Sequence, residues 1–145
     1  MWRELILETT DDVECGPPAT EQALAAVVAT LGQRLPRDLA ELLRECDGVR
    51  GRHGRDVVWS AERITRVNRE FRSYPDFPDL YMPFEPLMFF GAGDGGDQFA
   101  FVRTPERDDV FVWDHETDSR AMVTGSLHQY LLRALREGGD WFRND

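Results

Sequence analysis

Apolar side chains recur with a helical period through the first half of the chain. The clearest example is a set of four residues at positions i, i+3, i+4 and i+7: Leu24, Val27, Val28 and Leu31. This is the spacing of one face of an α-helix. The same period predicts further helices over residues 2–6, 36–47 and 60–72, and a closing helix that begins at residue 126. The N-terminal half is therefore predicted to be mainly helical.

Residues that can cap a helix N-terminus precede three of these segments. Thr20 and Ser60 each stand directly before a predicted first turn, where a hydroxyl oxygen can accept a hydrogen bond from a free backbone N–H. Ser126 and Gln129 form the Ser-x-x-Gln pattern of a capping box,. These three starts are the best-defined element boundaries that the sequence offers.

From residue 86 onward the period changes to that of β-strands. Four short runs rich in β-branched and aromatic residues cover 87–90, 98–103, 110–113 and 120–123, with polar turns between them. Such a succession predicts an antiparallel meander. Helices first, then strands and a closing helix indicate an α+β fold with a mostly antiparallel sheet. At 145 residues the chain is expected to form one domain, over residues 1–145,.

Two segments between these blocks have their own patterns. Residues 49–55 are basic and spaced by glycine, and they lead into the β-rich run 57–59, which together predict a hairpin,. Residues 74–86 contain four prolines among Phe and Tyr. Because proline disfavours helices and inner strands, this segment is predicted to be an ordered, extended connection.

Charge narrows the range of partners. The formal net charge is −10, and such a field repels nucleic acid and anionic lipid surfaces while it attracts basic proteins. The acid is concentrated in residues 76–118, which hold eleven Asp or Glu against two Arg. Residues 49–73 have the opposite charge balance, with seven Arg against three acidic residues. Four of these arginines, Arg63, Arg66, Arg69 and Arg72, are expected to form a solvated outer face of the helix over 60–72.

The predicted meander gathers carboxylates at one end of the sheet. Successive hairpin turns alternate between the two ends, so the first and third turns share an end. The five carboxylates of these turns are Asp94, Asp97, Asp114, Glu116 and Asp118. Such a cluster can meet a basic cleft on a partner protein. Solvated turns are the alternative, because Asp and Gly are the residues that hairpins need.

Aromatic residues of the proline-rich segment supply a second kind of candidate. Some of Tyr74, Phe77, Tyr81 and Phe84 are expected to be exposed contact residues, and we select Tyr81 as a partner-binding residue,.

We find no pattern that predicts catalysis, a cofactor or a metal site. The turn carboxylates offer hard oxygen ligands, yet neither turn has the calcium-loop pattern,. The three histidines stand in separate polar surroundings. Cys46 falls on a predicted core face, and Cys15 has no histidine partner evident in the sequence,. Two sparse cysteines outside any metal-binding spacing suggest a protein of the reducing cytoplasm, and no membrane span is expected.

A succession of short motifs resembles a known family. In order, they are Leu35-Pro36, Leu42-Leu43 leading to Asp47-Gly48, Pro86-Leu87-Met88-Phe89-Phe90-Gly91, Gly95-Gly96-Asp97-Gln98-Phe99 and Val110-Phe111-Val112-Trp113-Asp114. Together they make residues 20–135 similar to the SUKH superfamily of Smi/Knr-like domains. The resemblance implies an α+β fold without universal catalytic residues, in which the motifs determine the fold and the partner surface varies.

The resemblance also implies a function. Bacterial members act as immunity proteins that neutralise toxins of polymorphic and contact-dependent systems, and a fungal member regulates cell-wall synthesis. We therefore expect a non-catalytic protein that binds a basic toxin domain. A regulatory or scaffolding domain of the Smi/Knr type is the alternative, and a metal-dependent hydrolase that uses the turn carboxylates is a third hypothesis.

Overall fold

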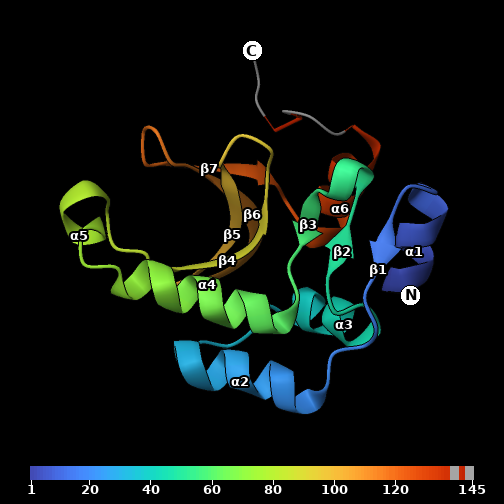
Figure 1. The fold of residues 1–145 in the computed structure, drawn as a ribbon, viewed down its shortest axis with the longest axis horizontal. Helices are drawn as coiled ribbons and strands as arrows, with labels where there is room; N and C mark the ends of the chain where they lie inside the picture. The colour runs from blue at the N-terminus through green and yellow to red at the C-terminus, as the bar shows by residue number, and fades with distance from the viewer. Residues whose placement is uncertain (138–140, 143–145) are drawn as a thin grey trace.

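The computed structural model describes residues 1–137, 141 and 142 of the chain. The predicted domain over residues 1–145 thus extends to residues outside this description. In the described part the fold is α+β, as predicted, with two antiparallel sheets and a closing helix. Figure 1 shows α2, α3 and α4 below the larger sheet, and α1 at the right of the molecule beside the small sheet.

The helices follow the apolar periods closely. Their bounds are α1 Trp2–Thr9, α2 Glu21–Leu31, α3 Arg37–Glu45, α4 Ala61–Ser73, α5 Phe77–Leu80 and α6 Leu127–Arg136. All three predicted caps are confirmed: Thr20 accepts a hydrogen bond from Ala23 N at 3.0 Å, Ser60 from Arg63 N at 3.3 Å, and Ser126 from Gln129 N at 3.2 Å. The local sequence thus sets where these three helices begin.

The two sheets differ in size. The small sheet has the order β1-β2-β3, with bounds Glu14–Cys15, Val49–Arg50 and Asp56–Val58. The larger sheet is the predicted meander, with bounds β4 Leu87–Ala92, β5 Gln98–Arg103, β6 Glu106–Asp114 and β7 Ser119–Thr124. The hairpin predicted over residues 49–59 is present as β2 and β3, joined by the 3-10 turn η1 Arg52–Gly54.

Two elements differ from the predictions. The strand β1 lies within the polar segment that separates α1 from α2, where two residues are too few to show a period. The prediction that residues 74–86 are extended throughout is wrong, because residues 77–80 form the single turn α5. Pro78 fits there because the first turn of a helix has no intrahelical partner for its N–H groups,.

The helical half is joined to the larger sheet along the outer edge of β4. The buried side chain of Asn68 on α4 accepts from Phe89 N at 2.8 Å and donates to Phe89 O at 2.9 Å. One residue further along, Trp59 N donates to Phe90 O at 2.7 Å. An edge strand carries unpaired polar groups that must find partners when buried. Asn68 and Trp59 supply them here.

The prediction that Arg72 belongs to a solvated face is wrong. Its guanidinium donates to Leu31 O at 3.1 Å and to Leu87 O at 2.9 Å, so it joins α2 to β4. Burial lowers the pKa of this guanidinium from its usual value. Arg66 and Arg69 are exposed as expected.

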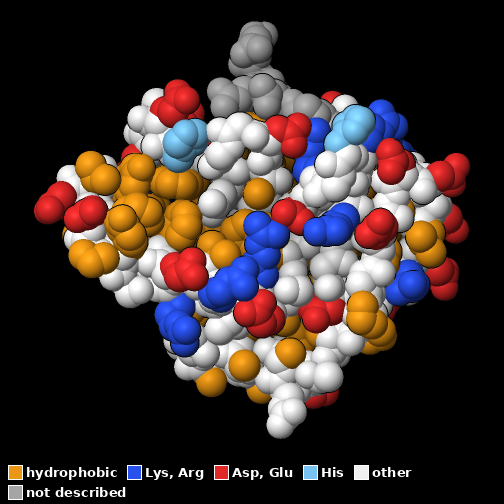
Figure 2. All heavy atoms as spheres, in the orientation of Figure 1, with side chains coloured by type: hydrophobic (Ala, Val, Ile, Leu, Met, Phe, Trp, Pro, Cys, Tyr) orange, Lys and Arg blue, Asp and Glu red, His pale blue; other side chains and the backbone are white. Residues whose placement is uncertain are grey.

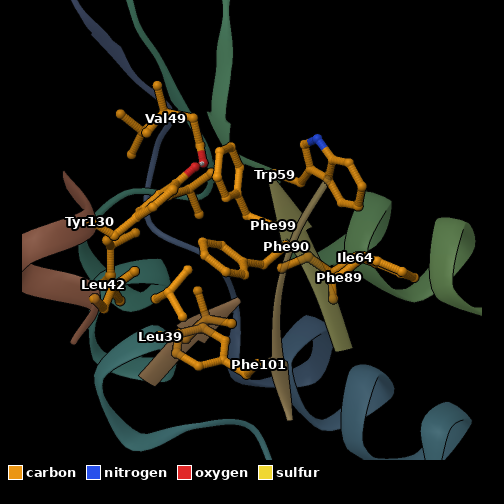
Figure 3. Packing of buried hydrophobic residues seen from close by; sticks show 14 of the residues in the cluster. Leu39, Leu42, Val49, Trp59, Ile64, Phe89, Phe90, Phe99, Phe101 and Tyr130 are labelled. Atoms are coloured by element: carbon orange, nitrogen blue, oxygen red, sulfur yellow. Dashed lines mark hydrogen bonds between the residues drawn. The ribbon is translucent and has the colours of Figure 1, made fainter. Parts of the chain in front are cut away.

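The core contains a closely packed group of aromatic rings. Figure 3 shows Tyr130 of α6 beside Phe90 and Phe99, with ring centroids 5.1 and 4.9 Å from that of Tyr130. The Tyr130 hydroxyl donates to Val57 O at 2.6 Å, and burial raises the pKa of Tyr130. A side chain at Gly91 would collide with Val57 O, so β3 can approach β4 only because this residue is glycine. The small and large sheets meet here.

We predict that Asn68→Ala lowers the free energy of unfolding by about 3 kcal/mol, because the buried N–H and C=O of Phe89 lose their partner. Urea unfolding followed by tryptophan fluorescence measures this change. Arg69→Ala, at the exposed neighbouring position, should stay within about 0.5 kcal/mol of the parent. Equal losses in both variants would show that Asn68 has no special part in the junction.

Candidate protein interface

The turns that carry the candidate carboxylates lie at one end of the larger sheet. Residues 93–97 connect β4 to β5, and residues 115–118 connect β6 to β7. Oxygen atoms of Asp97 and Asp114 lie within 4.8 Å of each other. Figure 1 shows α5 beside the second of these turns. This end of the sheet therefore brings together the turns and the proline-rich segment.

The five carboxylates have different surroundings. Asp94 is exposed but forms a bidentate ion pair with Arg55, with N–O distances of 3.0 and 2.6 Å. The hydrogen bonds from Arg55 hold the pKa of Asp94 below its usual value. Asp114 is half-buried, and its carboxylate accepts from Glu116 N at 2.9 Å. Glu116 itself is exposed.

Asp97 is not on the surface, although the predicted cluster of five carboxylates needs it there to contact a partner. Its exposed fraction is 1%, and its Oδ1 lies 3.6 Å from Nδ1 of His115. Gly96 stands at φ +92°, where a Cβ would lie 2.8 Å from the His115 ring. The histidine thus packs over the first turn and covers it. Hairpin alternation predicts which turns share an end, but it does not predict how deeply each side chain is buried.

Asp97, Asp114 and His115 form the one group of possible metal ligands that we find in the described part of the chain, with ligand atoms within 4.8 Å of one another. Two carboxylates and an imidazole are a donor set that suits transition metals better than calcium. The hydrogen bond from Glu116 N already orients Asp114. In the structure, these three residues join two neighbouring turns.

Asp118 fastens the proline-rich segment to the sheet. Its carboxylate accepts from Met82 N at 2.8 Å and from the Trp113 indole at 2.8 Å, and it pairs with Arg120 at 3.2 Å. Burial favours a raised pKa for Asp118, but these three donors outweigh it and hold the pKa below its usual value. Arg120 in turn donates to Pro83 O at 2.8 Å. Asp118 is thus largely occupied within the molecule.

Tyr81 also lies where the proline-rich segment meets the end of the larger sheet. Its ring packs edge-on against Trp113 with centroids 5.2 Å apart, and its hydroxyl lies 3.4 Å from the backbone oxygen of His115. Tyr81 is half-buried, whereas its neighbours Leu80 and Met82 are exposed. The structure therefore places Tyr81 at the foot of a surface whose outermost apolar residues the sequence analysis did not select.

Several acidic residues on this surface were also not selected. Asp76, Asp79 and Glu85 are exposed within the segment that contains α5. They lie outside the hairpin turns, although they contribute to the same local excess of negative charge. The aromatic residues and prolines around them are the sequence feature that could have indicated a binding surface here.

The described cysteines are free, and the predicted core position of Cys46 is confirmed. Burial, together with the nearby Cys15 thiol, raises the pKa of Cys46 to about 12. A thiol with this pKa is protonated near neutral pH and is a poor nucleophile.

We predict that Asp118→Asn lowers the free energy of unfolding by about 2 kcal/mol near neutral pH, because the amide loses the charge and at least one accepted hydrogen bond. Asparagine tolerates the φ of +60° found at this position,. The carboxylate contributes fully above the ordinary aspartate pKa of 3.8 and less as the pH falls toward the lowered folded-state value,. The difference between parent and variant should therefore shrink on acidification below 3.8.

Thermal unfolding across this pH range, with Glu116→Gln as the exposed control, tests the prediction. A pH-independent difference would mean that the charge of Asp118 is not what stabilises the segment.

Comparison with known proteins identifies the family. Among the described helices, none is both long and apolar enough to cross a membrane. A search of curated proteins found no match. Residues 18–133 match the model of the SMI1 / KNR4 family (SUKH-1). The match covers well over half of the chain and includes every motif on which the resemblance was based. The chain belongs to the SMI1 / KNR4 (SUKH-1) family.

Proposed function

We propose that the chain is a non-catalytic immunity-type protein that neutralises a toxin by stoichiometric binding to a basic toxin domain. The observation that carries this proposal is the exposed acidic and apolar surface at the end of the larger sheet. Asp76, Asp79, Glu85 and Glu116 are exposed there beside apolar side chains. Membership of the SUKH-1 family supports a binding role.

The acidic surface can act in two stages. Its field attracts a basic partner over distances of about a Debye length, roughly 8 Å at physiological ionic strength, which speeds encounter. Contact then aligns individual charges and rejects partners of the wrong sign. Neither stage requires a catalytic group.

We also infer that the protein acts in a reducing cytoplasm. The free thiols of Cys15 and Cys46 support this location,.

The test is binding and neutralisation of the toxin domain encoded next to this chain. We expect a complex of one copy of each protein in light scattering and loss of toxin activity at equimolar ratio. A chain that binds its neighbour's product without reducing toxicity, or whose gene has no toxin beside it, would favour a regulatory or scaffolding role instead.

We predict that the double variant Asp79→Arg, Glu116→Arg slows association with the toxin domain by about tenfold at low salt, with a smaller effect at high salt. Stopped-flow fluorescence measures the rate. The matched control is Glu4→Arg, Glu8→Arg, which changes the net charge equally at exposed positions of α1, on the other side of the molecule (Figure 1). Equal slowing in both variants would assign the effect to total charge and not to this surface.

We predict that calorimetric titration with calcium, magnesium and manganese gives no heat of binding. Saturable heat that disappears in Asp114→Asn would contradict a metal-free binding domain. It would support the hydrolase hypothesis, since Asp114 belongs to the possible ligand group.

A further inference from the structure

Exposed apolar side chains concentrate on the segment between α4 and β4. Tyr74, Leu80 and Met82 are 51%, 64% and 55% exposed, although they lie within nine residues of one another. Figure 2 shows hydrophobic side chains gathered at the left of the molecule, where Figure 1 places α5, with acidic side chains at their margin. Clustering of this kind is typical of an interaction site, whereas single exposed apolar residues are normal.

A groove borders this patch, and Met82 belongs to both. It has a volume of about 220 Å³ and is lined mainly by aromatic and apolar residues of the α4 end and the proline-rich segment: Phe71, Phe77, Pro78, Tyr81, Met82 and Phe84. Arg72 and Glu85 also line it. Phe84, which lines the groove, belongs to the buried core and is 3% exposed. A groove of this size and composition fits a bulky apolar side chain.

The walls of the groove are held in place without a partner. The ring of Phe77 packs edge-on against Tyr81 at 5.3 Å and against Phe84 at 5.7 Å. Met82 N is bound by Asp118, and Met82 O accepts from Arg120 at 2.8 Å. Little conformational entropy is then lost on binding, which is the condition under which apolar contacts contribute most to affinity.

The charges around the groove select the partner's chemistry. Asp76, Asp79, Glu85 and Glu116 are exposed at its margin and in the adjoining turn, and residues 73–102 contain no basic residue. Within the described part of the chain, none of these four carboxylates takes part in an ion pair. Two arginines lie beside the groove. Arg72 donates to backbone carbonyls, and Arg120 donates to backbone carbonyls and pairs with Asp118. A partner must therefore bring its own cations.

We propose that this groove binds a bulky apolar side chain of a partner protein, and that arginine or lysine residues flanking that side chain pair with the surrounding carboxylates. The inference rests on the proposed function, because it assumes a basic protein partner. An anionic membrane would be repelled by these carboxylates. A second copy of this chain that used the same surface in a two-fold symmetric contact would bring the same negative charges to it.

The test is selection of random short peptides displayed on phage against the immobilised full chain. The expected consensus is one bulky apolar residue flanked by Arg or Lys. The selected peptide, synthesised with a fluorescent label, should bind Met82→Arg at least about tenfold more weakly than the parent. Met122→Arg is the matched control, because Met122 is 56% exposed on β7 and does not line this groove. The control should bind as the parent does.

Both methionines are exposed, so neither change should disturb folding, and equal thermal midpoints check this. Selected peptides without the apolar and basic consensus would overturn the proposal, as would equal affinity for Met82→Arg and Met122→Arg. Dimerisation of the parent that Met82→Arg abolishes would also overturn it, as would binding to phosphatidylserine vesicles that Met82→Arg abolishes.

The outcomes that contradict the groove proposal differ from those that contradict the proposed function. If the neighbouring toxin domain binds Met82→Arg as tightly as the parent, the groove is wrong and the function stands. If the peptides bind as expected but the toxin domain does not bind the parent, the groove stands and the toxin-neutralising function is wrong.

Discussion

The outer edge of β4 is the constraint on which the rest of the molecule depends. An edge strand that is buried must find partners for its backbone N–H and C=O groups. Here they come from outside the sheet, from the side chain of Asn68, the backbone N–H of Trp59 and the guanidinium of Arg72. These contacts join the helices to the meander, and the glycine at position 91 lets β3 and Tyr130 approach the same strand.

This junction explains why an apolar segment is exposed. The chain must leave the end of α4 and return to the start of β4, and residues 74–86 make that connection past the end of the sheet. Asp118 and Arg120 hold the segment there through backbone hydrogen bonds. Its inner aromatic residues pack on Trp113, whereas Tyr74, Leu80 and Met82 remain exposed to solvent. Groups that stabilise the fold thereby also position the candidate binding surface.

The sequence predicts elements best where several local signals agree. The capped helices and the meander have both a period and suitable ends, and the structure contains them. The strand at Glu14 and the single turn α5 are too short to carry a period. The sequence predicts a solvated Arg72 because a helical period gives the direction in which a side chain leaves the helix. It does not give how far that side chain extends or what it contacts. A long guanidinium at the last turn of α4 extends to carbonyls of two other elements.

The candidate site was harder to predict because a carboxylate can serve either the fold or a partner. Asp94, Asp97 and Asp118 each face a cationic or polar group of the molecule itself, whereas Asp76, Asp79, Glu85 and Glu116 face solvent. Sequence reasoning counted the first group as available because hairpin geometry placed them together. All of these charges add to the long-range field, but a desolvated contact depends on the exposed ones. The total charge therefore indicates the sign of the partner, and burial decides where contact can occur.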